Sequence, residues 1–320
     1  MTICEEITAL FPIRRTKEQK QAFRQWVTER IAGMGWTVRT EANARGHQQN
    51  LIVGDPEHAE FICTAHYDTP ANILLPDLQI PRSFPVYLLY QMVLIIAMLG
   101  IAFLAGAAAG LATQSGDVML LTFFGAFVAL MAVQLYGPAN RHNVNDNTSG
   151  VAALMEAMAD IPEDARDKVA FILFDNMEKG RKGSKAYAAE HQQMQYTAFV
   201  VNLDSVGVGD TFVAAVPSLV RQLPQYERLT DILHRGGRDV RFHSAATTRS
   251  NSDFRSFKCG VGITAYRQVS GVGLYLGDLH TARDTHADEA NIAFLAQALS
   301  ALAAECASAA DASADSSAEG

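Results

Sequence analysis

The sequence predicts an α/β domain built on a largely parallel sheet and interrupted by a two-helix transmembrane hairpin. Short β-rich runs alternate with helical patterns along most of the chain, and two long apolar segments lie between residues 82 and 136. Strands that alternate with helices are typical of parallel sheets with helices on both faces. Binding sites in such sheets form at the carboxyl ends of the strands, so the residues that follow each predicted strand are candidates for a site.

Local patterns predict the individual elements of the α/β domain. Thr16 followed by Gln19 has the form of a capping box and predicts a helix that continues to about Met34. β-rich runs and apolar periodicity predict the remaining elements. We expect strands at residues 50–53, 61–65, 169–174, 199–203 and 262–266, and helices at residues 149–160, 184–193, 219–235 and 288–304.

The two apolar segments, residues 86–111 and 118–136, contain no Asp, Glu, Lys or Arg. At about 1.5 Å per residue, each helix would be long enough to cross a hydrocarbon core of roughly 30 Å. A pair of buried core helices is the alternative, but core helices rarely run this far without a charged residue. The short polar link at residues 113–117 predicts a hairpin whose two ends emerge on the same side of the membrane.

The charges around the hairpin predict its orientation. Arg82, Arg141 and His142 flank the ends that face the rest of the protein, whereas the link holds Asp117 and no Lys or Arg. The positive-inside rule then places the polar domain in the cytoplasm. Small residues at 106–110 would let the two helices approach closely.

Composition limits the domain organisation and the partners. We expect residues 1–81 and 137–306 to form one discontinuous domain, residues 82–136 the hairpin, and residues 307–320, rich in Ala, Ser, Asp and Glu, a disordered tail. The net charge of −8 argues against a nucleic-acid partner. The four cysteines form no CxxC pair, which fits a reducing compartment.

Several residues that can bind a metal ion lie beside the ends of predicted strands or before a predicted helix. Any one of them alone is more often a helix cap or a surface charge. Together, two imidazoles and three carboxylates suit a pair of divalent ions bridged by one carboxylate, and zinc is the ion that this donor set favours. The candidates are His66, Asp146, Glu178, Asp204 and His280.

The segments that carry these candidates resemble a known family. CTAHYDT, NDNTSGVAALME, FDNMEKGRKGSKAYA, VVNLDSVG and LHTARDT are similar, in order and spacing, to successive motifs of the co-catalytic zinc aminopeptidases of metallopeptidase family 28. That family also includes glutaminyl cyclases and carboxypeptidases. The resemblance implies a three-layer α/β domain with a central mixed, mostly parallel sheet, as in zinc exopeptidases.

The resemblance also implies roles for individual residues. Asp146 would bridge two zinc ions, or two other divalent ions. Asp68 would accept a hydrogen bond from His66 and fix its ring. One ion would be held by His66, Asp146 and Asp204, and the other by Asp146, Glu178 and His280. Residues 251–254 resemble the family's Ser-Asp stretch before a substrate-pocket helix, with Phe254 where a His often follows.

One departure from the family pattern concerns catalysis. The family normally has two adjacent glutamates, of which the first is the general base and the second binds metal. Here the alignment assigns the ligand to Glu178 and leaves Met177 at the base position. Methionine cannot take a proton, and losing a positioned base typically costs about 10² to 10⁴ in rate. Arg181 and Lys182 follow, and we interpret them as a solvated helix start rather than a substrate clamp.

Three functions remain open from the sequence. The first is a membrane-embedded zinc aminopeptidase or related hydrolase of peptides or aminoacyl amides, in which Asp175 or hydroxide alone replaces the missing base. The second is a metal-bound pseudo-peptidase that binds a peptide or a membrane partner without cleaving it. A transporter or channel is poorly supported, because two uncharged helices offer no ion path. The sequence favours the hydrolase, with a peptide or aminoacyl substrate and the lipid bilayer as partners.

Overall fold

A mixed sheet forms the centre of the computed structural model, which describes residues 1–44, 47–73, 79–81 and 83–318. Arg82, one of the charges used to predict the orientation of the hairpin, lies outside the described residues. The four central strands, β4, β3, β5 and β8, run parallel, and antiparallel neighbours flank them. Within the described residues the strand order is β1 (Val38–Ala42), β2 (Gln49–Val53), β4 (Val169–Phe174), β3 (Phe61–His66), β5 (Val200–Leu203), β8 (Gly260–Val269), β6 (Thr211–Val216) and β7 (Asp239–Ser244), with β9 (Gly273–Tyr275) paired to β8.

Helices cover both faces of this sheet, which confirms the predicted three-layer α/β fold. Strand β4 shows why: Phe171 and Leu173 belong to one core, and Ile172 and Phe174 to the other. A strand buried on both faces reads as a continuous apolar run. One face carries α1 (Ile3–Leu10), α2 (Lys17–Gly33), α5 (Ser149–Asp160), α8 (Pro224–Arg235) and α9 (Glu289–Ala318), and the other carries α6 (Lys182–Glu190) and α7 (Gln192–Thr197).

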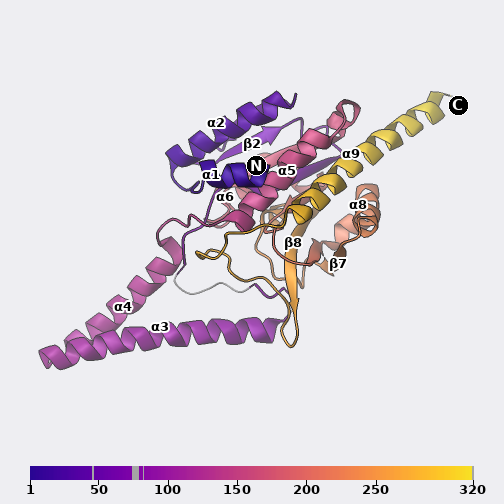
Figure 1. The fold of residues 1–320 in the computed structure, drawn as a ribbon. Coiled ribbons are helices and arrows are strands. Elements are labelled where there is room, and N and C mark those ends of the chain that lie inside the picture. Colours follow the sequence, from indigo (N-terminus) through magenta and orange to yellow (C-terminus); the bar gives the residue numbers. More distant parts are fainter. Residues whose placement is uncertain (45–46, 74–78, 82, 319–320) are drawn as a thin grey trace.

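The predicted hairpin consists of α3 (Phe84–Thr113) and α4 (Gly116–Tyr136). Figure 1 shows the two helices projecting together from one side of the domain. Gly106 lies against Met119 and Phe123, so the small residue allows the close approach predicted from the sequence. Large apolar side chains such as Leu121, which is 76% exposed, cover the outside of the hairpin.

Three of the described helices are long and apolar enough to cross a membrane. In the hairpin, 17% of the span in Pro85–Thr113 and 0% of that in Gly116–Gln134 is buried by the protein itself. The third, Glu289–Ala310, differs because half of its span is buried against the domain. It lies alongside α5 (Figure 1) and contributes to the main core, so it is a core helix of the α/β domain.

The C-terminal stretch differs from the expected disordered tail. Helix α9 continues to Ala318, and the last two residues lie outside the described part of the chain. The physical reason is composition, since alanine has the highest helix propensity and recurs throughout this stretch.

Candidate metal centre

The carboxyl ends of two parallel strands and one turn place the first three candidate ligands. His66 is the last residue of β3, and Asp204 directly follows β5, which is paired in parallel with β3. Asp146 lies in the turn before α5. The side chain of Asn147 ties that turn to β5, because it donates to the carbonyl of Leu203 at 2.9 Å and accepts from the backbone of Ser205 at 3.1 Å.

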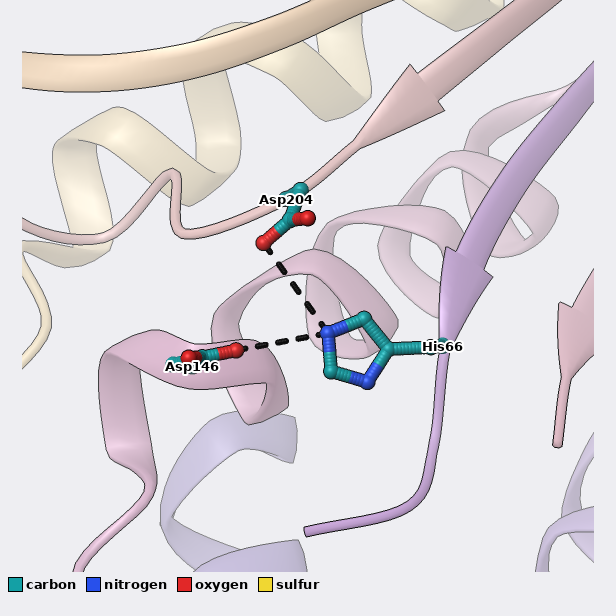
Figure 2. A group of neighbouring side chains, drawn as sticks. All are labelled: His66, Asp146 and Asp204. Carbon is teal, nitrogen blue, oxygen red and sulfur yellow. Dashed lines mark ion pairs between the residues drawn. The ribbon is translucent and has the colours of Figure 1, made fainter. Parts of the chain in front are cut away.

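His66, Asp146 and Asp204 point toward one another (Figure 2). The Nε2 atom of His66 lies 3.3 Å from Oδ1 of Asp146 and 3.9 Å from Oδ1 of Asp204. All three residues are buried. One nitrogen and two carboxylate oxygens therefore converge on a small volume.

A second group shares Asp146. Nε2 of His280 lies 2.9 Å from Oδ2 of Asp146 and 3.6 Å from Oε1 of Glu178. Because Oδ1 of Asp146 faces His66 and Oδ2 faces His280, this carboxylate offers one oxygen to each group. The structure thus brings together all five predicted ligands, in the two groups that the family resemblance implies.

Buried atoms that lack a hydrogen bond test whether these residues suit a metal. Among the described residues, Nε2 of His66, Oδ1 of Asp146 and Oε1 of Glu178 are buried without a hydrogen-bond partner. Burying a polar or charged atom without a partner is costly, and native proteins rarely leave one so. A cation bound between the groups would satisfy all three atoms, and imidazole with carboxylate is a donor set that suits zinc.

Charge and burial act strongly on these side chains. Burial alone would lower the pKa of His66, but the nearby carboxylates of Asp146, Asp204 and Asp68 hold it well above its usual value. Burial raises the pKa of Glu178 to about 8. Burial would also raise the pKa of Asp146, but the imidazoles of His280 and His66 beside it hold that pKa below its usual range.

Asp68 contacts His66 differently from the expected arrangement. Its backbone carbonyl lies 3.2 Å from Nδ1 of His66, whereas its carboxylate lies 3.6 Å from the same atom. The carboxylate instead accepts hydrogen bonds from the backbone N–H groups of Met177 at 2.9 Å and Glu178 at 3.2 Å. Its stronger role is therefore to hold the turn that carries Glu178.

Asp284 is a site residue that the sequence reasoning missed. Its Oδ1 and Oδ2 atoms accept from the backbone N–H groups of Asn145 at 2.7 Å and Asp146 at 3.0 Å. Asp284 is 4% exposed, and burial raises its pKa to about 7. The available signal was its position in LHTARDT, four residues after His280.

A cavity of about 280 Å³ is lined by four of the five ligand candidates, Asp146, Glu178, Asp204 and His280, and by Met177. Within the described residues, the carboxylates that line this cavity are those of Asp146, Glu178 and Asp204 alone. Asp175, considered as a replacement base, is not among the lining residues. It is 2% exposed and forms an ion pair with Lys20 at 2.7 Å.

The Ser-Asp stretch begins a short 3₁₀ turn at Asp253–Ser256 rather than a longer helix. Asp253 is fully buried and accepts from Ser184 at 2.5 Å, and burial raises its pKa to about 7. Asn251 lines the same cavity as Met177. This stretch therefore supplies one wall of the cavity.

Comparisons with known proteins agree with this geometry. The model of peptidase family M28 matches residues 133–304, a range that includes every ligand candidate except His66. No curated protein matches the sequence.

Solved structures show the same fold. A glutaminyl cyclase from Porphyromonas gingivalis has a TM-score of 0.59 at 16% identity, covering 95% of each chain. A Zn-dependent exopeptidase from Parabacteroides distasonis has a TM-score of 0.56 at 16% identity, covering 94% of each chain. The LapA aminopeptidase from Legionella pneumophila has a TM-score of 0.58 at 14% identity, covering 95% of this chain and 70% of the other. At these identities the likeness concerns the fold.

Proposed function

Because this chain belongs to peptidase family M28, we propose that it is a membrane-embedded, zinc-dependent aminopeptidase-like hydrolase of short peptides or aminoacyl amides. The observation that carries the proposal is the pair of ligand groups that share Asp146. His66 and Asp204 complete one group, and Glu178 and His280 the other. The exopeptidase from Parabacteroides distasonis, which has the same fold, is described as Zn-dependent.

Two zinc ions held by these groups would polarise the scissile carbonyl and lower the pKa of a water molecule. The chain itself contributes the positions of the ligands. Asp68 holds the turn of Glu178, and Asp284 holds the turn of Asp146, each through two backbone N–H groups. Such outer contacts fix ligand orientation and tune the affinity of a site.

Proton transfer is the weak step of this site. Met177 lines the cavity but has no group that can take a proton, and the carboxylates lining the same cavity are the ligand candidates themselves. Asp175 is held by Lys20 in a different cavity. We therefore propose slow turnover, reduced by about 10² to 10⁴ relative to a site with a positioned base.

The hairpin would hold the site at a membrane surface. Gln134 and Tyr136, at the end of α4, line a second cavity together with Glu178 and His280. A site this close to the base of the hairpin favours short peptides or exposed N-termini over large folded substrates. From the flanking charges, we propose that the domain lies in the cytoplasm.

Met177 also supports a second candidate function, a metal-binding pseudo-peptidase. Hydrolysis of a mixed aminoacyl-amide library by the full chain, purified in detergent and loaded with zinc, separates the two. The hydrolase proposal expects slow release of free amino acids that stops when the metal is chelated and returns when zinc is restored. Tight zinc binding with no cleavage of any library member would favour the pseudo-peptidase.

A further inference from the structure

A second cavity of about 410 Å³ lies between the metal centre and the base of the hairpin. The ligand candidates Glu178 and His280 line one part of it, and Gln134 and Tyr136 of α4 line another. Glu178 and His280 also line the first cavity, so the two cavities meet at these residues. A substrate bound at the metal centre can therefore extend into both.

Three cations line this second cavity: Arg15, Lys179 and Lys182. Arg15 donates to the backbone carbonyl of Gly137. Among the described residues, none of the three cations forms an ion pair with a carboxylate. We refer to this space as the basic cavity.

The carboxylates near these cations are already engaged. Both oxygens of Asp68 accept hydrogen bonds from backbone N–H groups, and Asp175 is paired with Lys20. Glu178 faces His280 in the metal centre. Asp68 and Glu178 also line this cavity, so three cations stand against two carboxylates, and an anionic ligand would offset the remaining excess of positive charge.

The first cavity has a different lining. No Lys or Arg is among its described lining residues, and its carboxylates are the candidate metal ligands Asp146, Glu178 and Asp204. The Lys and Arg side chains that could pair with an anionic group of the substrate therefore lie in the basic cavity, which gives the substrate one orientation. Complementary charge of this kind determines register and specificity more than raw affinity.

We propose that the basic cavity binds an anionic group on the leaving-group side of the substrate, either the free α-carboxylate of a short peptide or an acidic side chain next to the scissile bond. This inference rests on the proposed function and specifies its substrate class. Lys182 then acts as a substrate clamp rather than as part of a solvated helix start. Arg15, which also contacts Gly137 after α4, links substrate recognition to the hairpin.

Binding of uncleavable probes tests the proposal without relying on turnover. One pair is the reduced dipeptide Ala-ψ[CH₂NH]-Ala and its C-terminal carboxamide. The other pair is Ala-ψ[CH₂NH]-Glu-amide and Ala-ψ[CH₂NH]-Gln-amide, which differ only in the side-chain charge. Calorimetric titration of the zinc-loaded full chain should show the anionic member of at least one pair binding about tenfold more tightly, the scale of a charge-assisted hydrogen bond. The pair that shows the preference identifies the source of the anion.

Matched variants assign the preference to the cavity. Lys182→Gln and Arg15→Gln should each reduce it, and Lys182→Arg should retain it. Lys185→Gln is the control, because Lys185 is exposed on the same helix α6 and is not a lining residue of the basic cavity. Equal binding of both members of both pairs by the wild type would overturn the proposal, as would a preference that survives in Lys182→Gln and Arg15→Gln.

Two further results distinguish the anion subsite from the hydrolase function and from lipid binding. If no peptide is hydrolysed but the probe preference holds, the hydrolase function fails and the anion subsite stands. Anionic lipid headgroups are the competing ligand at the base of a membrane hairpin. Thermal unfolding in nanodiscs with and without phosphatidylserine tests for lipid binding. The substrate proposal would be overturned if anionic lipid stabilised the protein, if Lys182→Gln and Arg15→Gln abolished that stabilisation, and if neither probe pair showed a preference.

Discussion

The carboxylate of Asp68 accepts a hydrogen bond from the backbone N–H of Met177 at 2.9 Å, which ties the end of β3 to the turn that carries Glu178. Asp284 makes the equivalent connection to the turn of Asp146, from the loop that carries His280. Each acidic turn is thus held by a carboxylate from a different part of the chain. The ligand geometry depends on these two connections as much as on the strand ends.

Replacing either of these carboxylates should weaken metal binding. In Asp284→Asn and Asp68→Asn, an amide faces two backbone N–H groups and can no longer accept from both, so we expect a loss of about 10- to 100-fold in zinc affinity. Competition with a chromophoric chelator measures it. Asp167→Asn is the control, since its side chain is 67% exposed and contacts Lys168. Unchanged affinity in both test variants, with unchanged circular dichroism, would contradict this account of the turns.

Metal content should be close to two divalent ions per chain. Asp146 offers an oxygen to each group, so Asp146→Ala should remove more metal than His66→Ala, which damages one group. Elemental analysis of protein reloaded with zinc and dialysed gives the ratio. His58→Ala is the control, because the His58 side chain is 81% exposed and its ion pair is with Asp55. A wild type that retains no metal after reloading would refute the metal centre.

Close packing in the hairpin should depend on Gly106. A Cβ atom there would lie 2.7 Å from the backbone oxygen of Met119, whereas one at Gly100 would meet nothing within 4 Å. Gly106→Val should therefore cost about 1 to 3 kcal/mol of stability through overpacking, and Gly100→Val much less. Thermal unfolding in detergent compares them. Equal changes in the two variants would show that α3 and α4 do not pack as described.

Membrane insertion predicts resistance to extraction with carbonate and labelling of Ser115→Cys from outside the cell. The four native cysteines are buried, so an impermeant thiol reagent reports on the new one. Full solubility without detergent would refute the hairpin. Labelling only from the cytoplasmic side would keep the hairpin and reverse its orientation.

Much of the fold was predictable where local signals were strong. The capping box of Thr16 and Gln19 is present at the start of α2, and the helix at 149–160 and the strand at 169–174 have the predicted bounds. The predicted helix at 184–193 is broken at His191, which ends α6 and precedes α7. Two helices therefore replace the one predicted helix, because apolar periodicity does not reveal a local break of this kind.

The elements that the sequence did not predict include two strands without strong local signals, and a strand and a helix that have them. Strands β1 and β7 lie at the two edges of the sheet and carry charged, partly exposed residues, so they show no apolar run. Strand β6 is fully buried and reads TFVAAV, an apolar run of the kind that is typical of a buried strand. Helix α1 has a capping box of Thr2 and Glu5, the same signal that identified α2.

The candidate site was predictable as a set of ligands but not as a network. His66, Asp146 and Glu178 could be found because strand ends and motifs mark them, and the structure brings them together with the other two candidates. The roles of Asp68 and Asp284 depend on backbone N–H groups far away in the sequence. Side-chain chemistry alone does not specify such contacts, so only the folded chain reveals them.

The most direct test of the central claim compares hydrolysis by wild type, Met177→Glu and Met177→Gln, each loaded with zinc. Glutamate restores a group that can take a proton, whereas glutamine has a similar shape and cannot. We predict slow, metal-dependent cleavage of aminoacyl amides by the wild type, a rise in kcat/KM of about 10² or more in Met177→Glu, and no rise in Met177→Gln. Zinc binding by all three without cleavage by any would contradict the hydrolase function and leave the pseudo-peptidase in its place.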